Sequence, residues 1–561
     1  GSGHFTTRQN PQLNWPRLED VPEILAELAS VQMHAIQTSG NCIRNITSDH
    51  LAGIAADEVA DPRPFCELIR QWATLHPEFS YLPRKFKIAV SGAAHDRAAI
   101  KVHDIGLLLR KDADGALGFA VYVGGGLGRT PMIGELIRPF LHRRELLPYL
   151  EAILRVYNLQ GRRDNIHRAR IKILVKALGP AEFARQVEAE FERTRQNPDL
   201  LLDDDAIAAM QRFFAPPPYD PTAAEERDHL HWLQQDAAFA RWYARNTVPH
   251  KQPGYRGVFV ALKGFGRAPG DMSSEQMEAV ADLAERYNFG EIRVTHTQNL
   301  LLAHVRERDT HAVWQELNRH QLAAPVIGTL SDMIACPGLD FCALANAGSI
   351  DVAEQIRQRF EDLDYLYDLG DLRLNISGCM NACGHHHLGH IGILGVDKRG
   401  EEYYQLTLGG RGGLDAALGE RLGPAVPKHE VAETVARILE TYVALRQPGE
   451  SFLDTVQRVG IAPFKASVYA EPVSEERAHA YDHSRRRHRR GRLARLGRHR
   501  THPATGKNHR PAGSLVGGKT GAAGTRAPRR RRPPGAGSRS LRAGFRPTGF
   551  GADRRRVPGL S

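Results

Sequence analysis

Apolar and polar residues follow two different periods along the chain, and the two periods predict helices and strands. Residues 17–36 carry apolar side chains at helical spacing, which predicts an amphipathic helix. Residues 81–92 alternate between apolar and polar side chains, which predicts a strand with Lys85, Lys87 and Ala89 on one face. A mixed fold that combines α+β and α/β parts is therefore expected.

The elements that follow this strand are bounded by glycine and proline. A strand is predicted over Gly118–Val123, and it leads into the glycine loop Gly124–Gly128. The loop lacks the Lys-Ser/Thr pair of a phosphate-binding P-loop, so that function is not indicated. Long helices are predicted from about 134 to 213, and Ala215–Pro218 is typical of a linker.

The second half of the chain repeats the first half. Three pairs of segments match in the same order at offsets of 289, 286 and 285: Thr6–Asn10 with Thr295–Asn299, Ser91–Gly106 with Ser377–Gly392, and Val123–Gly125 with Leu408–Gly410. Such repetition predicts two similar units related by a pseudo-twofold axis, with a shared site between them.

Length and charge divide the chain further. A chain of 561 residues is too long for one hydrophobic core, so about two to four domains are expected. Residues 484–561 hold 23 Lys and Arg against one acidic residue, so the body of the chain is net acidic although the whole chain carries +11. This tail has few large apolar residues, and a disordered segment is expected. Its Arg/Gly/Pro/Ala composition resembles GC-rich DNA translated out of frame.

Four of the six cysteines form two close pairs. Cys336 and Cys342 are spaced C-x5-C, and Cys379 and Cys383 are spaced C-x3-C. Four thiolates suit zinc or an iron–sulfur cluster, and the wide first gap favours a [4Fe–4S] cluster over a zinc knuckle. Flanking glycines are expected to let the backbone approach a bulky cluster. Four unrelated buried thiols are the alternative.

The cysteines occur only in the second copy of the repeat. In the first copy, Ala93 stands where Cys379 would be, and Arg97 stands where Cys383 would be. The second copy is therefore expected to hold the metal, and the first copy is expected to supply a different part of the site.

Basic residues in the first copy predict what it supplies. Arg44, Arg84, Lys85 and Lys87 lie around the predicted strand, and Arg8 lies in the opening motif. A solvated basic face would explain such residues without any site. Alternatively, guanidinium and ammonium groups together form a pocket that binds and polarises a small oxyanion.

Together these motifs resemble the siroheme-dependent nitrite and sulfite reductases, and most closely the assimilatory sulfite reductase hemoproteins. The resemblance covers about residues 4–470 and rests on the two cysteine pairs, Thr-x-Arg-Gln at 6–9, Leu-Pro-Arg-Lys-Phe-Lys at 82–87 and Thr-x-Thr-Gln-Asn at 295–299. It implies a duplicated fold, in which two ferredoxin-like halves and two larger domains enclose siroheme and a [4Fe–4S] cluster.

The resemblance also implies roles for individual residues. The cluster ligands would be Cys336, Cys342, Cys379 and Cys383, and Cys383 would also be the axial ligand of the siroheme iron. Arg44, Lys85 and Lys87 match the substrate-binding positions. The positions near the siroheme and its carboxylates are Arg8, Arg84, Gln298 and Asn299.

The chain departs from the family pattern in two places. It opens inside a strand-and-turn motif, so a preceding segment with a further anion-binding arginine is expected to be missing. Asn14 stands where some members carry a histidine. His385–His387 suggest a separate zinc site on the residues alone, but the resemblance makes them part of the scaffold.

The resemblance predicts five regions. These are a truncated ferredoxin-like remnant (1–34), a first siroheme-facing domain with the anion residues (35–215), a second ferredoxin-like half (245–320), a cluster and siroheme domain (325–475) and the basic tail (484–561).

The expected function is six-electron reduction of sulfite to sulfide, with nitrite reduction to ammonia as the alternative. Electrons are expected from ferredoxin or an NADPH-dependent flavoprotein, because no flavin or nicotinamide motif is present. No run reaches the ~20 apolar residues of a membrane span, and a cytoplasmic location is expected. A cluster protein that binds nucleic acid through its tail is a remote alternative, and no specific nucleic acid is expected.

Overall fold

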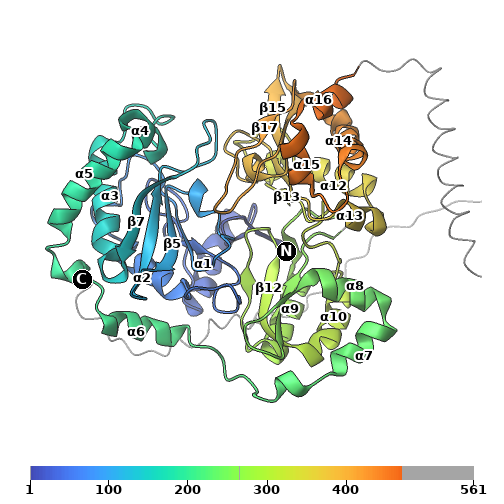
Figure 1. The fold of residues 1–561 in the computed structure, drawn as a ribbon, viewed down its shortest axis with the longest axis horizontal. Coiled ribbons are helices and arrows are strands. Elements are labelled where there is room, and N and C mark those ends of the chain that lie inside the picture. Colours follow the sequence, from blue (N-terminus) through green and yellow to red (C-terminus); the bar gives the residue numbers. More distant parts are fainter. Residues whose placement is uncertain (1, 265, 471–561) are drawn as a thin grey trace, which may run out of the picture. The chain divides into compact units, whose positions relative to one another are not determined.

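Two mixed sheets carry most of the predicted site residues. The computed structural model describes residues 2–264 and 266–470, shown in Figure 1 with the colours following the sequence. The first sheet has five strands in chain order. Its strands are β3 (Thr47–Ser48), β4 (Ile88–Ser91), β5 (Ile105–Lys111), β6 (Leu117–Val123) and β7 (Glu135–His142). Its helices are α2 (Arg63–Ala73), α3 (Leu146–Gln160), α4 (Ile171–Leu178), α5 (Pro180–Thr194) and α6 (Asp204–Phe213). We call this sheet with its helices the first module.

The second sheet repeats the first. Its main strand path is β13 (Ile334–Ala335), β14 (Leu374–Ser377), β15 (Ile391–Lys398), β16 (Glu401–Leu408) and β17 (Glu420–Arg421), and β18 (Val426–Pro427) also pairs with β16. Its helices are α11 (Gly338–Phe341), α12 (Ile350–Arg359), α13 (Leu363–Leu369), α14 (Val431–Leu445), α15 (Phe452–Val459) and α16 (Ala462–Val468). We call this sheet with its helices the second module.

Strand direction confirms the predicted duplication. In each sheet the first three strands run parallel, and the next two are antiparallel. The matched turns also agree: Thr6 N donates to Asn10 O, and Thr295 N donates to Asn299 O, both at 2.9 Å. Gln9 and Gln298 both have a left-handed backbone, with φ values of 57° and 59°.

The strand expected over residues 81–92 is shorter than predicted. Only β4 is regular, and Phe86 adds an isolated bridge to Ile43. Lys85 and Lys87 therefore precede the strand. All four residues of β4 are buried, because a central parallel strand is covered on both faces. The helices expected from about residue 134 begin at Leu146, since 135–142 forms β7.

A third sheet precedes the second module. Its strand order is β11-β12-β9-β8, with β8 (Thr247–Pro249), β9 (Tyr255–Val260), β11 (Arg293–Val294) and β12 (Leu300–Arg306). Its helices are α7 (Asp228–Gln235), α8 (Ala237–Asn246), α9 (Ser274–Tyr287) and α10 (Thr310–Arg319). Ser273 and Gln276 form a capping box that fixes the start of α9. We call this sheet with its helices the ferredoxin-like half.

The N-terminal segment has little core of its own. Strand β1 (Ser2–Phe5) pairs with β2 (Pro11–Gln12) and with β10 (Asp271–Ser273), and α1 spans Val21–Ser30. Residues 11–40 include no buried side chain. The repeat matches this segment to β12, whose apolar side chains are buried, and to α10, which buries Val313 and Leu317.

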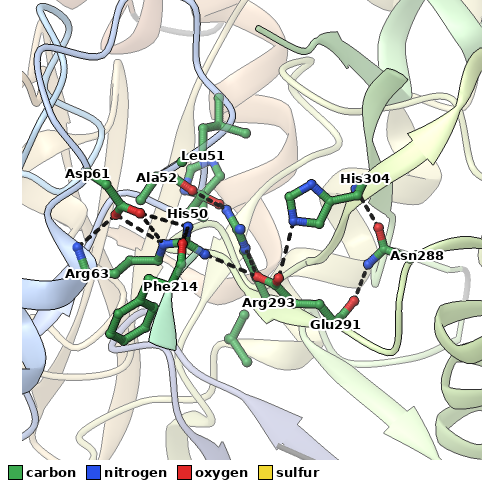
Figure 2. A network of polar contacts seen from close by, with 12 residues as sticks. His50, Leu51, Ala52, Asp61, Arg63, Phe214, Asn288, Glu291, Arg293 and His304 are labelled. Carbon is green, nitrogen blue, oxygen red and sulfur yellow. Dashed lines mark hydrogen bonds and ion pairs between the residues drawn. The ribbon is translucent and has the colours of Figure 1, made fainter. Parts of the chain in front are cut away.

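A network of charged side chains joins the first module to the ferredoxin-like half (Figure 2). Glu291 accepts from Arg293 Nε at 2.5 Å, and its other oxygen lies 3.2 Å from His304 Nε2. Arg63 lies 3.5 Å from the same carboxylate. Arg293 also donates to Ala52 O at 2.6 Å. Burial raises the pKa of Glu291, but its contacts with His304 and the two arginines outweigh burial and leave the pKa well below its usual value.

Across residues 2–264 and 266–470, every helix is too short or too polar to span a bilayer. The predicted basic tail at 484–561 lies outside the described residues.

Candidate functional site

The two cysteine loops lie side by side where parallel strands β13 and β14 end. Cys336 directly follows β13, and Cys379 lies two residues beyond β14. Cys336 N donates to Ile376 O at 3.2 Å, and Gly378 N donates to the Cys336 sulfur at 3.1 Å. A backbone N–H that donates to sulfur stabilises the thiolate, which is the form that binds metal.

Glycines bring the two loops together, whereas the sequence suggested that they make room for a cluster. A Cβ added at Gly378 would come within 2.5 Å of Ala347 O and 2.9 Å of Gly338 Cα. Gly338 has a φ of +60°, and a Cβ there would lie 2.4 Å from the Ser349 hydroxyl oxygen. Larger residues at either glycine would force the cysteine loops apart.

The four thiols influence one another electrostatically. Burial raises the pKa of Cys379, and the neighbouring Cys336 and Cys342 thiols raise it further. Cys379 is buried, whereas Cys383 is the exposed member of the set. Four thiolates in one place repel, and a multi-iron cluster supplies the positive charge that offsets this repulsion. The donor set therefore fits a [4Fe–4S] cluster.

A single-ion site is not formed in the part of the chain that the structure describes. No group of three or more His, Cys, Asp or Glu side chains there has the geometry for one metal ion. His385–His387 therefore form no such site. His387 Nε2 lies 3.1 Å from Gly128 O, so it ties the cysteine loop to the glycine loop. His386 is buried, and neither of its ring nitrogens has a hydrogen-bond partner among the described residues.

Lys85 and Lys87 form a cationic wall near Cys383. Lys87 N donates to Asp104 Oδ2 at 2.8 Å. This bond holds the backbone directly before β4, where the two lysines lie. Neither ammonium group has a hydrogen bond or ion pair with any residue that the structure describes. Burial lowers the pKa of Lys85, and it lowers the pKa of Lys87 well below the usual value, with the nearby arginines adding to both effects. The Cys383 side chain is solvent-accessible, but the protein around it still desolvates the thiol and raises its pKa, while Lys87 and Lys85 lower it.

Arg8 is held at this wall by uncharged partners. It donates to Thr47 Oγ1 at 3.1 Å and to Asn45 O at 2.7 Å. It also donates to His103 Nε2 at 2.5 Å, because His103 Nδ1 donates to a backbone carbonyl and leaves Nε2 as the acceptor. Burial lowers the pKa of Arg8 to about 9 despite the nearby Asp104 carboxylate. The adjacent Thr7 hydroxyl donates to Cys383 O at 2.9 Å, so the opening motif contacts the cysteine loop directly.

Arg44 and Arg84 lie within electrostatic range of Lys85. Arg44 donates to Thr38 O, and its Nε is buried without a partner among the described residues. Burial lowers the pKa of Arg44. The structure therefore brings the predicted basic residues of the first module together with Cys383.

Gln298 and Asn299 are engaged by the protein itself. The Gln298 amide donates to Ala335 O at 2.8 Å and accepts from Ala335 N at 2.9 Å, which holds the residue before Cys336. Asn299 accepts from Leu262 N at 3.0 Å and donates to Asp332 at 2.9 Å. Their predicted contact with a tetrapyrrole stays a prediction.

Asp104 and Arg170 were not predicted from the sequence. Arg170 Nη2 lies 2.7 Å from the Asp104 carboxylate, which is fully buried. Arg170 directly precedes α4, far from every repeated motif, so no sequence signal marked it. Backbone carbonyls in and beside the glycine loop accept hydrogen bonds from a lysine of the same chain. Lys172 donates to Leu127 O at 2.8 Å and to Thr130 O at 2.6 Å.

An ion-pair cluster occupies the first module where the second holds cysteines. Arg97 lies 2.7 Å from Asp49 and 2.9 Å from Asp57. Arg97 matches Cys383 in the repeat, and Asp49, directly after β3, matches Cys336 directly after β13. The expectation that only one copy could hold a cluster agrees with this replacement.

Known proteins similar to this chain include both nitrite and sulfite reductases. It is 28% identical over 496 residues to the assimilatory ferredoxin-dependent nitrite reductase of Haloferax mediterranei, which covers 85% of this chain and 78% of that protein. It is 28% identical over 460 residues to sulfite reductase [ferredoxin] 1 of Mycolicibacterium paratuberculosis, which covers 80% of this chain and 75% of that protein.

A solved structure is also similar. The Mycobacterium tuberculosis NirA protein matches with a TM-score of 0.67 and 28% identity, over 82% of this chain and 79% of that chain. The predicted duplicated fold is confirmed by this match.

Family descriptions match three parts of the chain. Residues 39–195 and 328–476 match the nitrite and sulphite reductase 4Fe-4S domain, and residues 249–320 match the nitrite/sulfite reductase ferredoxin-like half domain. The 4Fe-4S domain alone spans more than half of the sequence. On the strength of this match, the chain belongs to the nitrite and sulphite reductase family.

Proposed function

We propose that this oxidoreductase reduces sulfite to sulfide with six electrons, at a siroheme coupled to a [4Fe–4S] cluster. The single observation that carries the proposal is the cationic wall beside Cys383, in which the Lys85 and Lys87 ammonium groups have no described partner. Nitrite reduction to ammonia is the second candidate, because similar proteins act on either anion according to their names.

The residues present fit both prosthetic groups. Cys336, Cys342, Cys379 and Cys383 would hold the cluster, and the exposed Cys383 would also bind the siroheme iron. Cations without carboxylate partners suit the carboxylates of a tetrapyrrole, with Arg8 and Arg84 as the proposed contacts. When bound, the two groups supply one-electron transfers and an iron that binds substrate.

Lys85, Lys87 and Arg44 would bind the oxyanion and supply protons. Each S–O bond of sulfite breaks as its oxygen leaves as water, so three bonds consume six electrons and six protons. The lowered pKa of each lysine makes its ammonium group a readier proton donor, and solvent can protonate it again. Arg44, whose Nε has no partner among the described residues, would hold the anion by charge-assisted hydrogen bonds.

The choice of sulfite over nitrite rests on Lys87. Sulfite carries more negative charge than nitrite at neutral pH and has three oxygens in a pyramid. A second ammonium group near Lys85 therefore favours sulfite more than nitrite. By resemblance, sulfite reductases share this Lys-x-Lys pattern, whereas plant-type nitrite reductases tend to have Asn at the second position.

The electron donor is proposed to be ferredoxin, because similar proteins are named as ferredoxin-dependent. An NADPH-dependent flavoprotein is the alternative. The proposed role is assimilatory, in the cytoplasm.

The test combines cofactor analysis with kinetics. Purified protein should absorb visible light as a siroheme protein, contain acid-labile sulfide, and have a higher kcat/KM for sulfite than for nitrite with a chemical reductant. A preference for nitrite would support the second candidate. A colourless protein with stoichiometric zinc, or one that binds nucleic acid and reduces neither anion, would refute both.

A further inference from the structure

We infer that Arg170 is a further oxyanion-binding residue beside the Lys85 and Lys87 wall, and that the buried carboxylate of Asp104 positions it. The inference rests on the proposed function, because it assumes that the cationic wall beside Cys383 binds an oxyanion. The oxyanion is either the substrate or a carboxylate of the tetrapyrrole, since a guanidinium fork binds both kinds of group in the same way.

Asp104 holds two parts of the site at once. Its Oδ1 accepts from Arg170 Nε at 3.0 Å and from Arg170 Nη2 at 2.8 Å, and its Oδ2 accepts from the same Nη2 at 2.7 Å. Its Oδ2 also accepts from Lys87 N at 2.8 Å. A fully buried carboxylate therefore fixes Arg170 and the backbone of the lysine wall relative to each other.

The repeat indicates that this carboxylate is specific to the cationic module. In the second module His390 stands in the place of Asp104, and its Nδ1 accepts from Arg373 N at 3.3 Å, as Asp104 accepts from Lys87 N. Both modules thus use a side chain to hold the backbone before the central strand. A histidine is sufficient for that bond, whereas the aspartate also provides a counter-charge for Arg170.

Arg170 is fixed from its backbone as well. The buried Tyr157 hydroxyl donates to Ala169 O at 2.8 Å, and α4 begins directly after Arg170. The side chain is nevertheless 17% exposed, and its Nη1 has no partner among the residues that the structure describes. The guanidinium is therefore rigid and keeps one donor group for a ligand.

The charges around Arg170 favour an anionic ligand. Arg170 lies within electrostatic range of Arg8, Arg44, Lys85 and Lys87, and it adds to the effect of burial in lowering the pKa of each. The groups that act in the opposite direction include the Asp104 carboxylate, which acts on Arg8, and the Cys383 thiol, which acts on Lys85 and Lys87. The hydrogen bonds of Asp104 go to Arg170 and to a backbone N–H. One carboxylate does not neutralise five cations, so an oxyanion at Arg170 would relieve their repulsion.

The test compares Arg170→Met and Arg170→Lys with Arg97→Met. Arg97 is a matched control because it also pairs with a buried aspartate of the first module. For each variant, siroheme per chain is measured by absorbance, KM and kcat are measured for sulfite and nitrite, and Tm reports folding. Arg170→Met should either raise KM about tenfold or more, with a smaller change in kcat, or lower siroheme content by a similar factor.

The two measurements identify the source of the oxyanion. A raised KM with full siroheme content indicates the substrate, and siroheme loss indicates a cofactor carboxylate. Arg170→Lys should restore part of either loss, because it keeps the charge. Unchanged KM and siroheme content in Arg170→Met, or the same losses in Arg97→Met, would overturn the inference. If Arg170→Met does not fold, Arg170→Lys decides, because loss of the fork alone should still lower anion affinity. Wild-type protein that reduces neither anion would instead refute the proposed function.

A double-mutant cycle tests the positioning role of Asp104. Asp104→Asn removes a negative charge, so a purely electrostatic role predicts tighter anion binding with or without Arg170. Positioning predicts that Asp104→Asn weakens binding when Arg170 is present and does not weaken it in Arg170→Met. Equal effects in both backgrounds would overturn this part of the inference.

Discussion

Arg97 pairs with Asp49 at 2.7 Å, in the positions that Cys383 and Cys336 occupy in the second module. The first module thus has an ion pair at these positions, whereas the second module has thiols that can hold a cluster. This difference explains how a duplicated fold could provide one cluster and one cationic wall.

The ion pair is expected to be structural. Arg97→Met would leave the Asp49 carboxylate, which is almost fully buried, without its counter-charge. Unfolding free energy should fall by about 3 kcal/mol, and iron content should not change. Urea unfolding and iron analysis check both outcomes. If Arg97→Met remained folded but lost iron, the ion pair would also support the cluster, and the prediction would be wrong.

Gln298 is expected to support the cluster through the cysteine loop. Gln298→Ala removes two hydrogen bonds to Ala335 and should speed the loss of iron to a chelator. Gln9→Ala is the matched control, because Gln9 makes the equivalent bond to Ser48 N at 3.0 Å in the module without cysteines. Each variant should lose about 1–3 kcal/mol of stability. Equal rates of iron loss in the two variants would argue against a role at the cluster.

Cys383 is expected to couple the two prosthetic groups. Cys383→Ser should abolish six-electron reduction, because it removes the one residue proposed to hold both the cluster and the siroheme. Cys66→Ser, outside the cysteine loops, should keep wild-type turnover. Sulfite kinetics and absorption spectra check the prediction, and wild-type turnover in Cys383→Ser would rule out the shared-ligand role.

The network around Glu291 predicts a dependence of stability on pH. Because the pKa of Glu291 is lower in the folded chain than its usual value of 4.5, its ionisation stabilises the fold above that pH. This contribution is lost as the pH falls below that value toward the lowered pKa. Glu291→Gln should therefore cost about 2 kcal/mol at pH 7 and progressively less in acid. The measurement is Tm as a function of pH, with Glu285→Gln at an exposed position as the control. A difference in Tm between wild type and Glu291→Gln that does not depend on pH would contradict the prediction.

The sequence predicted the cysteine pairs and the repeat because both can be recognised from residue types and spacing. Spacing relates Cys336 to Cys342, and similar offsets of 285 to 289 residues relate the repeated segments, including Gln9 and Gln298. It did not predict that Lys85 and Lys87 precede the strand, because strand ends depend on pairing with distant residues. Asp104 and Arg170 are 66 residues apart and meet only through packing, so periodicity gives no sign of their contact.

The exposure of residues 11–40 could not be predicted either. Residues 17–36 have the apolar pattern of a buried helix, and the pattern does not reveal whether a partner covers it. Burial depends on what packs against a helix, which only the structure shows.

The central claim is that Lys87 makes this a sulfite reductase, and Lys87→Asn tests it most directly. The measurement is steady-state kinetics on sulfite and nitrite with a chemical reductant. The kcat/KM for sulfite should be about 10- to 150-fold lower than in the wild type. This factor corresponds to the loss of one charge-assisted hydrogen bond of about 1.5–3 kcal/mol. The kcat/KM for nitrite should change much less. The control is Lys111→Asn, the same substitution at an exposed strand end, which should leave the kcat/KM for both anions unchanged. An equal loss on both anions, or a wild-type preference for nitrite, would contradict the account and favour nitrite reduction.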